Sequence, residues 1–266
     1  MPVLEIKNVN KTFPLEKSQI SVLENVSFSV DKDEFICLVG PSGCGKSTVL
    51  RIIAGLEKAD SGEVLFHGQP QTSPSPKLTM IFQLFGLLPW RTALENVEVP
   101  LEVLGIKKEA RVEIATNYLR MVGLEGFENT YPHDLSGGMK QRVGIARALA
   151  LQPQVLLMDE PFSSLDELTA KTLRELVLEI WRDQSLPTNT FVMVSHNVEE
   201  AVYMADRVVV MSPRPGRVVG EVKVNLPRPR TQYLRDQKYF QSVDEVVTIL
   251  EKSKRENQAN NQNHLT

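Results

Sequence analysis

The chain has 266 residues, of which 42% are hydrophobic and 24% charged, and 30 basic against 33 acidic side chains leave a formal charge of −3. This composition is ordinary for a soluble globular protein, and the length suits one large domain or two small ones. It argues against a dedicated nucleic-acid-binding protein, which usually has a strongly basic domain. The two cysteines, Cys37 and Cys44, form neither a disulfide framework nor a zinc pattern, which suits a reducing compartment.

Nothing in the sequence predicts a membrane-inserted segment. The N-terminal run MPVLEIKNVN contains charges and has no apolar core, so no signal peptide is expected. The longest charge-free, mostly apolar stretch, Leu78 to Trp90, has thirteen residues. A membrane-spanning helix needs about 20. We therefore expect a chain that is soluble by itself and acts at a membrane only through a partner.

Short apolar runs alternate with helical periodicity along the chain. The alternation over the first thirty residues predicts antiparallel strands, and the run Phe35 to Val39 predicts a buried parallel strand. Ser61 and Gly62 indicate a turn. Further strands are expected at 78–82, 155–158, 190–194 and 207–211, and helices at 46–56, 92–122 (broken near Gly105), 138–151, 167–182 and 197–204. This alternation predicts an α/β fold with a parallel sheet.

The composition changes after Leu226. The run PRPR indicates a linker, residues 243–250 predict one amphipathic helix, and the polar residues 257–266 are expected to be disordered. About forty residues are too few for another regulatory domain.

The most informative motif is GPSGCGKST, from Gly40 to Thr48, which matches G-x-x-x-x-G-K-[ST] between an expected strand and an expected helix. Gly43 and Gly45 would let the backbone curl so that its N–H groups converge on phosphate oxygens at the helix N-terminus. Lys46 would neutralise the β- and γ-phosphates, and Ser47 would ligate Mg²⁺. The other nucleotide-contacting positions of the loop are Gly40, Pro41, Ser42, Cys44 and Thr48.

Two alternatives concern this loop. It could be a glycine-rich turn that happens to precede a lysine, although the flanking strand and helix favour a phosphate loop. Cys44 could be a reactive thiol with a lowered pKa, but a small residue that fills space is the favoured interpretation, and no redox role is assigned.

A second acidic motif, VLLMDEP from Val155 to Pro161, is an apolar strand with two acids at its carboxyl end. Ligands of open parallel sheets bind at that edge. Asp159 would hold Mg²⁺, and Glu160 would polarise the attacking water as general base. The alternative is an Asp-Glu pair at a solvated strand end, which is common by itself but disfavoured beside a phosphate loop.

The motif LSGGMKQ, from Leu135 to Gln141, places Ser136, Gly137 and Gly138 at the expected start of a helix, as a second anion site. With the two motifs above, Gln83 and His196, all in matching order and spacing, the chain resembles the ATP-binding subunit of an ABC transporter over roughly residues 1–225. The resemblance implies a P-loop NTPase (RecA-like) parallel-sheet core, an N-terminal antiparallel β subdomain, an inserted α-helical subdomain at about 86–150 and a short C-terminal extension at 226–266.

The resemblance also implies site roles. Two ATP molecules with Mg²⁺ would be sandwiched in a head-to-tail dimer, either a homodimer or a pair with another ATPase subunit. Ser136, Gly137 and Gly138 would then face the γ-phosphate held by the partner subunit. Phe13 takes the position that stacks on adenine, where tyrosine is more usual, with core packing as its alternative. Gln83 would touch Mg²⁺ and the attacking water and link both to the membrane domain. Asp166 would face the dimer, and His196 would contact the γ-phosphate.

Two details complete the histidine assignments. Asn197 stands where aspartate is commoner in the family, a departure that leaves His196 intact. His67, His133 and His264 fit no metal spacing and are assigned no role.

Three strings resemble the nitrate, sulfonate and taurine importer group, which also includes bicarbonate systems: FGLLPW at 85–90, MSPRPGRV at 211–218 and LPRPR at 226–230. The implied function is ATP hydrolysis that energises uptake of such a solute through separate permease subunits, with an extracytoplasmic solute-binding protein. The chain would lie on the cytoplasmic face of the inner membrane. Alternatives are another importer or exporter group, or a soluble ABC ATPase acting on nucleic acid or ribosomes. No nucleic-acid partner is expected.

An apolar cluster follows Gln83 directly. It consists of Phe85, Leu87, Leu88 and Trp90. These side chains would either form a cleft for a short permease helix or fold inward into the core.

Overall fold

The computed structural model describes the backbone of residues 2–16 and 18–263 and side chains as far as residue 258. His264 and the last residues expected to be disordered lie outside this range. The chain divides into two compact units, one of Met1–Pro74 with Val192–Thr266 and one of Ser75–Phe191. The second unit is larger than the helical subdomain expected at 86–150, because two strands and a further helix cluster with those helices.

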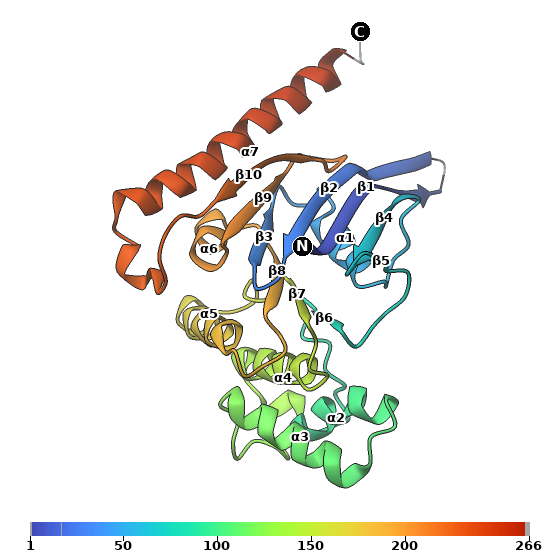
Figure 1. The fold of residues 1–266 in the computed structure, drawn as a ribbon, viewed down its shortest axis with the longest axis vertical. Coiled ribbons are helices and arrows are strands. Elements are labelled where there is room, and N and C mark those ends of the chain that lie inside the picture. The colour runs from blue at the N-terminus through green and yellow to red at the C-terminus, as the bar shows by residue number, and fades with distance from the viewer. Residues whose placement is uncertain (1, 17, 264–266) are drawn as a thin grey trace. The chain divides into compact units, whose positions relative to one another are not determined.

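An antiparallel sheet opens the first unit (Figure 1). It contains β1 (Pro2–Leu15), β2 (Ser18–Asp31), β4 (Ser61–Phe66) and β5 (Gln69–Pro70), in the order β2-β1-β4-β5. The expected N-terminal antiparallel strands are confirmed. Strand β4 occupies the place of the expected turn, because Gly62 permits close approach: a Cβ there would lie 2.3 Å from the Asn8 carbonyl oxygen.

A second sheet of the first unit has the order β10-β9-β3-β8. Strand β3 (Phe35–Val39) is buried throughout and runs parallel to β9 (Arg207–Met211), and β10 (Val218–Lys223) is antiparallel to β9. Strand β8 (Thr190–Ser195) is also buried. Helices α1 (Lys46–Ile53) and α6 (Val198–Met204) follow β3 and β8 in the chain. The parallel pairing of β3 with β9 agrees with the sequence; β10 was not expected.

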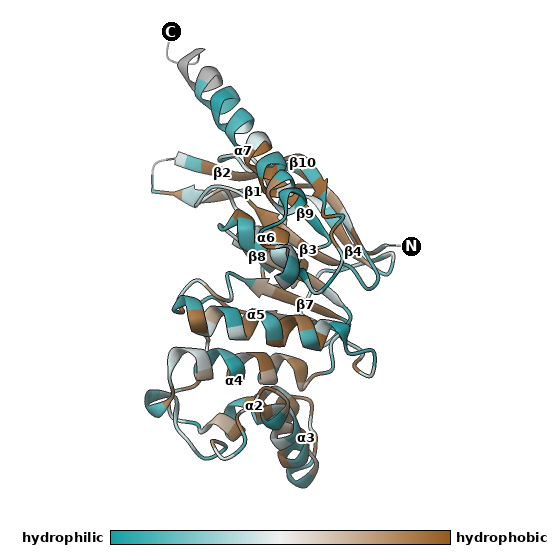
Figure 2. Ribbon diagram, turned by 90° about the vertical axis from the view of Figure 1, so that its left-hand side faces the viewer, coloured by the Kyte–Doolittle hydropathy of each residue, from teal (hydrophilic) through white to brown (hydrophobic). Residues whose placement is uncertain are grey.

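The C-terminal extension belongs to the first unit. After the 3-10 helix η2 (Arg230–Tyr233), α7 (Gln237–Asn263) contacts α6, β9 and β10 and then continues past them (Figure 1). Beyond these contacts, and as far as residue 258, α7 is mainly hydrophilic (Figure 2). The helix is longer than expected, and residues 257–263 are helical where disorder was expected. Buried Tyr239 and Val246 attach the helix to the unit, and Glu, Lys and Arg residues at 251–256 favour helix by propensity.

The second unit combines two parallel strands with a group of helices. Strands β6 (Leu78–Ile81) and β7 (Val155–Asp159) are paired in register. The helices are α2 (Ala93–Val103), α3 (Lys108–Met121), the 3-10 helix η1 (Pro132–Asp134), α4 (Gly137–Leu149) and α5 (Glu167–Arg182). Helices α2, α3 and α4 pack on one another, and α4 also contacts α5 and β6. The expected break falls at Gly105, whose φ is 74°.

Within the part of the chain that the structure describes, none of the helices combines the length and the hydropathy that crossing a bilayer requires.

Candidate nucleotide site

The loop between β3 and α1 has the backbone shape of a phosphate loop. Gly43 and Gly45 have φ angles of 76° and 102°, in the left-handed region that favours glycine. Gly45 is also the N-cap of α1, and no side chain caps that helix end or places an acid in its first turn. The N–H groups of the first turn are therefore suited to an external anion.

Lys46 places its ammonium at the same loop. Its side chain is buried, and Nζ donates to the carbonyl oxygens of Gly40 at 2.8 Å and Pro41 at 3.1 Å. The loop thus combines an uncapped helix end with a cation. A polyphosphate fits this set of donors, and the Ser47 hydroxyl is a hard oxygen ligand of the kind that Mg²⁺ prefers.

Gly216, whose backbone packs closely against this loop, was not predicted from the sequence as part of the site. Gly216 of the MSPRPGRV string donates its N–H to the Val22 carbonyl oxygen at 2.8 Å, and its own carbonyl accepts from Glu24 at 3.0 Å. A Cβ at Gly216 would lie 2.0 Å from the Cys44 carbonyl oxygen, inside the phosphate loop. Only a glycine allows this approach. A glycine between proline and arginine in a family-typical string was the available signal.

Both cysteines are fully buried and free. Burial raises the pKa of the Cys44 thiol, and raises that of Cys37 well above its usual value, so both remain protonated at neutral pH. The structure agrees with Cys44 as a residue that fills space.

Phe13 lies in β1, opposite Ile20 of β2, and is half-buried. The Nζ of Lys11 lies 5.0 Å from its ring centroid. That ammonium also pairs with Glu57 at 2.7 Å, and the Glu57 hydrogen bond raises the pKa of Lys11. One side of the ring is therefore held by a fixed cation.

His196 is exposed in the loop between β8 and α6. Its neighbours are held by a short network: Ser195 Oγ donates to the Glu200 carboxylate at 2.6 Å and accepts from the Asn197 N–H at 3.0 Å. The Asn197 side chain caps α6 by accepting from the Glu200 N–H. Asparagine caps a helix as well as aspartate does. This explains why the departure at position 197 is tolerated.

In the second unit, the structure brings Gln83 and Glu160 together. The Nε2 of Gln83 donates to Oε2 of Glu160 at 3.3 Å. Glu160 follows the buried Asp159 at the end of β7 and has a φ of 46°, a left-handed conformation that is uncommon for a residue with a side chain. Ser163 donates to its carbonyl oxygen from both N–H and Oγ. Such held strain is typical of functional positions.

The LSGGMKQ residues begin α4 as expected. The Ser136 side chain caps the helix by accepting from the Met139 N–H at 3.2 Å. Gly138 also has a packing role, because a Cβ there would lie 2.4 Å from Thr169 Cγ2 of α5. Asp166 caps α5 by accepting from the Thr169 N–H at 3.0 Å, and hydrogen bonds from Thr169 lower the pKa of its carboxyl.

The loop after Gln83 is anchored by its backbone. Arg147 of α4 donates to the carbonyl oxygens of Gly86 at 2.6 Å and Phe85 at 2.9 Å, where both residues have positive φ. The fully buried Asn96 of α2 accepts from the Leu88 N–H at 2.7 Å and donates to the Leu88 carbonyl oxygen at 3.1 Å. Sequence reasoning missed Arg147 and Asn96, since neither lies in a recognised motif.

The side chains of this loop are not all buried. Leu84 is 80% exposed and Trp90 is 70% exposed. Phe85, Leu87 and Leu88 are half-buried. The interpretation in which the cluster folds inward is therefore wrong for Trp90. The loop presents apolar side chains from an anchored backbone.

The predicted site residues are shared between the two units. The first unit contains Phe13, residues 40–48 and His196, and the second contains Gln83, the Ser136–Gly138 turn, Asp159, Glu160 and Asp166.

Comparison with known proteins agrees with these motifs. The ABC transporter family model matches residues 23–163. An uncharacterized ABC transporter ATP-binding protein of Methanocaldococcus jannaschii is 48% identical over 85% of this chain and 84% of its own length. A nitrate import ATP-binding protein of Synechocystis is 42% identical over 93% of this chain and 94% of its own, and an aliphatic sulfonates import ATP-binding protein of Bacillus cereus is 42% identical over 86% and 89%.

A solved structure is similar as well. A dimeric ATP-binding cassette in a post-hydrolysis state with ADP and phosphate is 35% identical, with a TM-score of 0.73 over 84% of this chain and all of that one. The phosphate loop, the acid pair at the end of β7 and the capped start of α4 agree with this likeness. The chain belongs to the ABC transporter family, as one of the ATP-binding proteins that bind ATP with Mg²⁺ and hydrolyse it to drive transport.

Proposed function

We propose that this chain is the ATPase subunit of an importer for a small solute such as nitrate, bicarbonate or a sulfonate, including taurine. It works as a homodimer on separate permease subunits at the cytoplasmic face of the inner membrane, with an extracytoplasmic solute-binding protein. The names of its relatives support this proposal: nitrate import, bicarbonate transport and aliphatic sulfonates import, each at 40–43% identity.

One observation favours coupling to a permease. Gln83 contacts Glu160, and the loop that begins at Gln83 exposes Leu84 and Trp90 while Arg147 and Asn96 hold its backbone. Apolar side chains grouped on one exposed surface often mark an interaction site. A permease helix that docks on Leu84 and Trp90 would shift Gln83, and so the Glu160 carboxylate.

The residue roles follow from the chemistry of the groups. The phosphate-loop N–H groups and Lys46 bind the β- and γ-phosphates, and Ser47 and Asp159 hold Mg²⁺, which neutralises charge on the phosphate oxygens when bound. Glu160 takes a proton from the attacking water, an effect worth about 10²- to 10⁴-fold in rate. Gln83 orients that water.

The remaining contacts involve the nucleotide and the second copy. His196 meets the γ-phosphate and Phe13 stacks on adenine. The Ser136–Gly138 turn and Asp166 of a second copy close the site, so that two ATP molecules lie in one dimer. The dimeric ADP-and-phosphate structure of a relative supports this arrangement.

The Glu160→Gln variant tests the catalytic assignment. The amide keeps the shape of the side chain but is a poor base, so ATP binding should persist while hydrolysis falls by about 10²-fold or more. The variant should elute as an ATP-dependent dimer in size exclusion. Glu63→Gln, on the exposed part of β4, is the control. Near-normal hydrolysis by Glu160→Gln would reject Glu160 as the base.

Transport assays test the solute class. Co-purified permease and binding protein, reconstituted with this chain in vesicles, should take up labelled nitrate, bicarbonate or taurine in an ATP-dependent way. If none of these solutes stimulates hydrolysis and a different solute does, the substrate class is wrong but the ATPase assignment still holds.

A further inference from the structure

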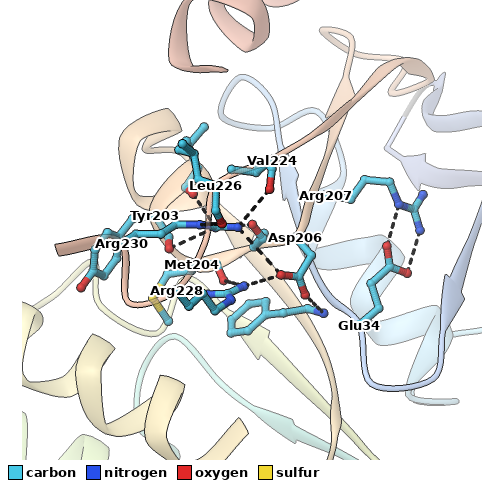
Figure 3. A network of polar contacts seen from close by, with 12 residues as sticks. Glu34, Tyr203, Met204, Asp206, Arg207, Val224, Leu226, Arg228 and Arg230 are labelled. Atoms are coloured by element: carbon cyan, nitrogen blue, oxygen red, sulfur yellow. Dashed lines mark hydrogen bonds and ion pairs between the residues drawn. The ribbon is translucent and has the colours of Figure 1, made fainter. Parts of the chain in front are cut away.

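The PRPR run after Leu226 is packed into the first unit and does not behave as a linker. Arg230 is 2% exposed, and its guanidinium donates to five backbone carbonyl oxygens (Figure 3). Three of these acceptors lie at the end of α6 and two lie after β10: Val202, Tyr203, Ala205, Val224 and Leu226. Arg228 adds a bond to the Met204 carbonyl oxygen at 2.7 Å.

These two arginines donate hydrogen bonds to carbonyl groups at the C-terminal end of α6. The last four carbonyl groups of a helix have no partner within it, and a cation there also interacts favourably with the helix dipole. Helix α6 has seven residues and no basic residue in its own last turn. So short a helix is marginal by itself. Its position therefore depends on contacts from outside: its buried face packs on β3, β9 and α7, and Arg230 and Arg228 bind the carbonyl groups at its end.

The C-terminal helix holds the other end of α6. Tyr239 of α7 is 4% exposed, and its hydroxyl donates to the Glu199 carbonyl oxygen at 2.8 Å. Glu199 lies in the first turn of α6, three positions after His196. The C-terminal segment thus contacts α6 at both ends. The Ser195–Asn197–Glu200 network ties that helix to the two residues on either side of His196.

We propose that residues 226–239 form a clamp that positions His196 through α6, with Arg230 and Tyr239 as its positioning residues. The inference rests on the proposed role of His196 at the γ-phosphate. It assigns this part of the C-terminal extension to the ATPase itself.

A second chain of contacts runs from the same segment through Asp206 to strand β3. Its effect on the nucleotide site must be distinguished from an effect through α6. Asp206 accepts from Arg228 at 2.7 Å and from the Phe35 N–H at 3.0 Å, and Nη2 of Arg230 lies 3.8 Å from its carboxylate (Figure 3). Arg230 therefore contacts both routes, and Tyr239→Phe is the variant that tests α6 alone. Phe35 begins β3, the strand that leads into the phosphate loop. A clamp acting along β3 would change nucleotide affinity, whereas one acting through α6 would change the rate of hydrolysis at unchanged affinity.

The test uses Tyr239→Phe and Arg230→Met in the full chain. Tyr239→Phe keeps the buried ring and removes the hydroxyl bond to Glu199. Tyr233→Phe and Arg235→Met, in the same segment but outside the contacts with α6 described above, are the matched controls. We expect kcat to fall by roughly 2- to 30-fold in the clamp variants, the usual range for coupling through packed elements. The Kd for a fluorescent ATP analogue should not change.

The same substitutions are then placed in a His196→Ala background, with hydrolysis followed by release of labelled phosphate. When several residues act through one group, the effects of their substitutions on the rate are strongly non-additive. Tyr239→Phe and Arg230→Met should therefore cause no further loss once His196 is gone. Thermal melts identify folded variants, and if Arg230→Met does not fold, Tyr239→Phe decides.

Three results would overturn the clamp: normal kcat in folded clamp variants, an equal loss with and without His196, or weakened nucleotide affinity instead of a slower rate. Normal hydrolysis by His196→Ala alone would refute the proposed role of His196, and the clamp with it. Failure of the His196 role can be told apart from failure of the clamp, since the His196→Ala variant leaves the C-terminal segment unchanged.

Discussion

At the scale of single residues, Gly216 offers a sharp test of how the phosphate loop is supported. A methyl group at Gly216 would lie 2.0 Å from the Cys44 carbonyl oxygen, so Gly216→Ala must displace the loop backbone. We expect the free energy of unfolding to fall by about 1–3 kcal/mol, the usual effect of overpacking, and ATP binding to weaken because the loop is displaced. Fluorescent-nucleotide titration measures this. Gly144→Ala is the control, since its methyl would meet Phe85 O at 3.6 Å.

The position of a functional residue could be predicted from the sequence where the spacing of a motif determines it. The phosphate loop, the Asp159–Glu160 pair and the serine at the start of α4 lie on the elements that their motifs predicted. Gly216 and Arg230 were not predictable in this way. Each acts through backbone atoms of segments distant in sequence, and only the folded chain brings those atoms near.

At the scale of elements, Arg147 links α4 to the loop after Gln83. Burial lowers the pKa of its guanidinium, but Arg147 remains charged at neutral pH and donates to two loop carbonyls. In Arg147→Met we expect faster amide hydrogen exchange over 84–91 and little change in ATP affinity. The exposed Arg120→Met is the matched control. Unchanged exchange in the loop would show that Asn96 alone holds it.

Most elements were predictable from periodicity, and two of the missed strands have a similar cause. Helix α5 and strands β3 and β9 have the predicted bounds, because their apolar runs are long or strongly periodic. Strands β4 and β10 were missed. Each contains a glycine that serves close packing in the fold, Gly62 or Gly220, and Gly62 suggests a turn in the sequence.

At the scale of the whole molecule, the exposed loop after Gln83 should matter only when the permease is present. Leu84→Glu places a charge where an apolar helix would dock, so we expect transport and permease-stimulated hydrolysis to collapse. ATP binding by the isolated subunit should stay unchanged. Leu56→Glu, at another exposed leucine in the first unit, is the control. Full transport by Leu84→Glu would remove the loop from the docking surface.

The two buried thiols make this chain suitable for selective labelling. Because burial raises the pKa of Cys37 and Cys44, a maleimide at neutral pH should modify neither in the native chain and both after unfolding, as intact mass would show. Rapid modification of native Cys44 would mean that the phosphate loop opens. A cysteine introduced by Pro89→Cys, at the exposed position beside Trp90, would then be the sole reactive thiol of the chain, and its protection by permease vesicles would report docking.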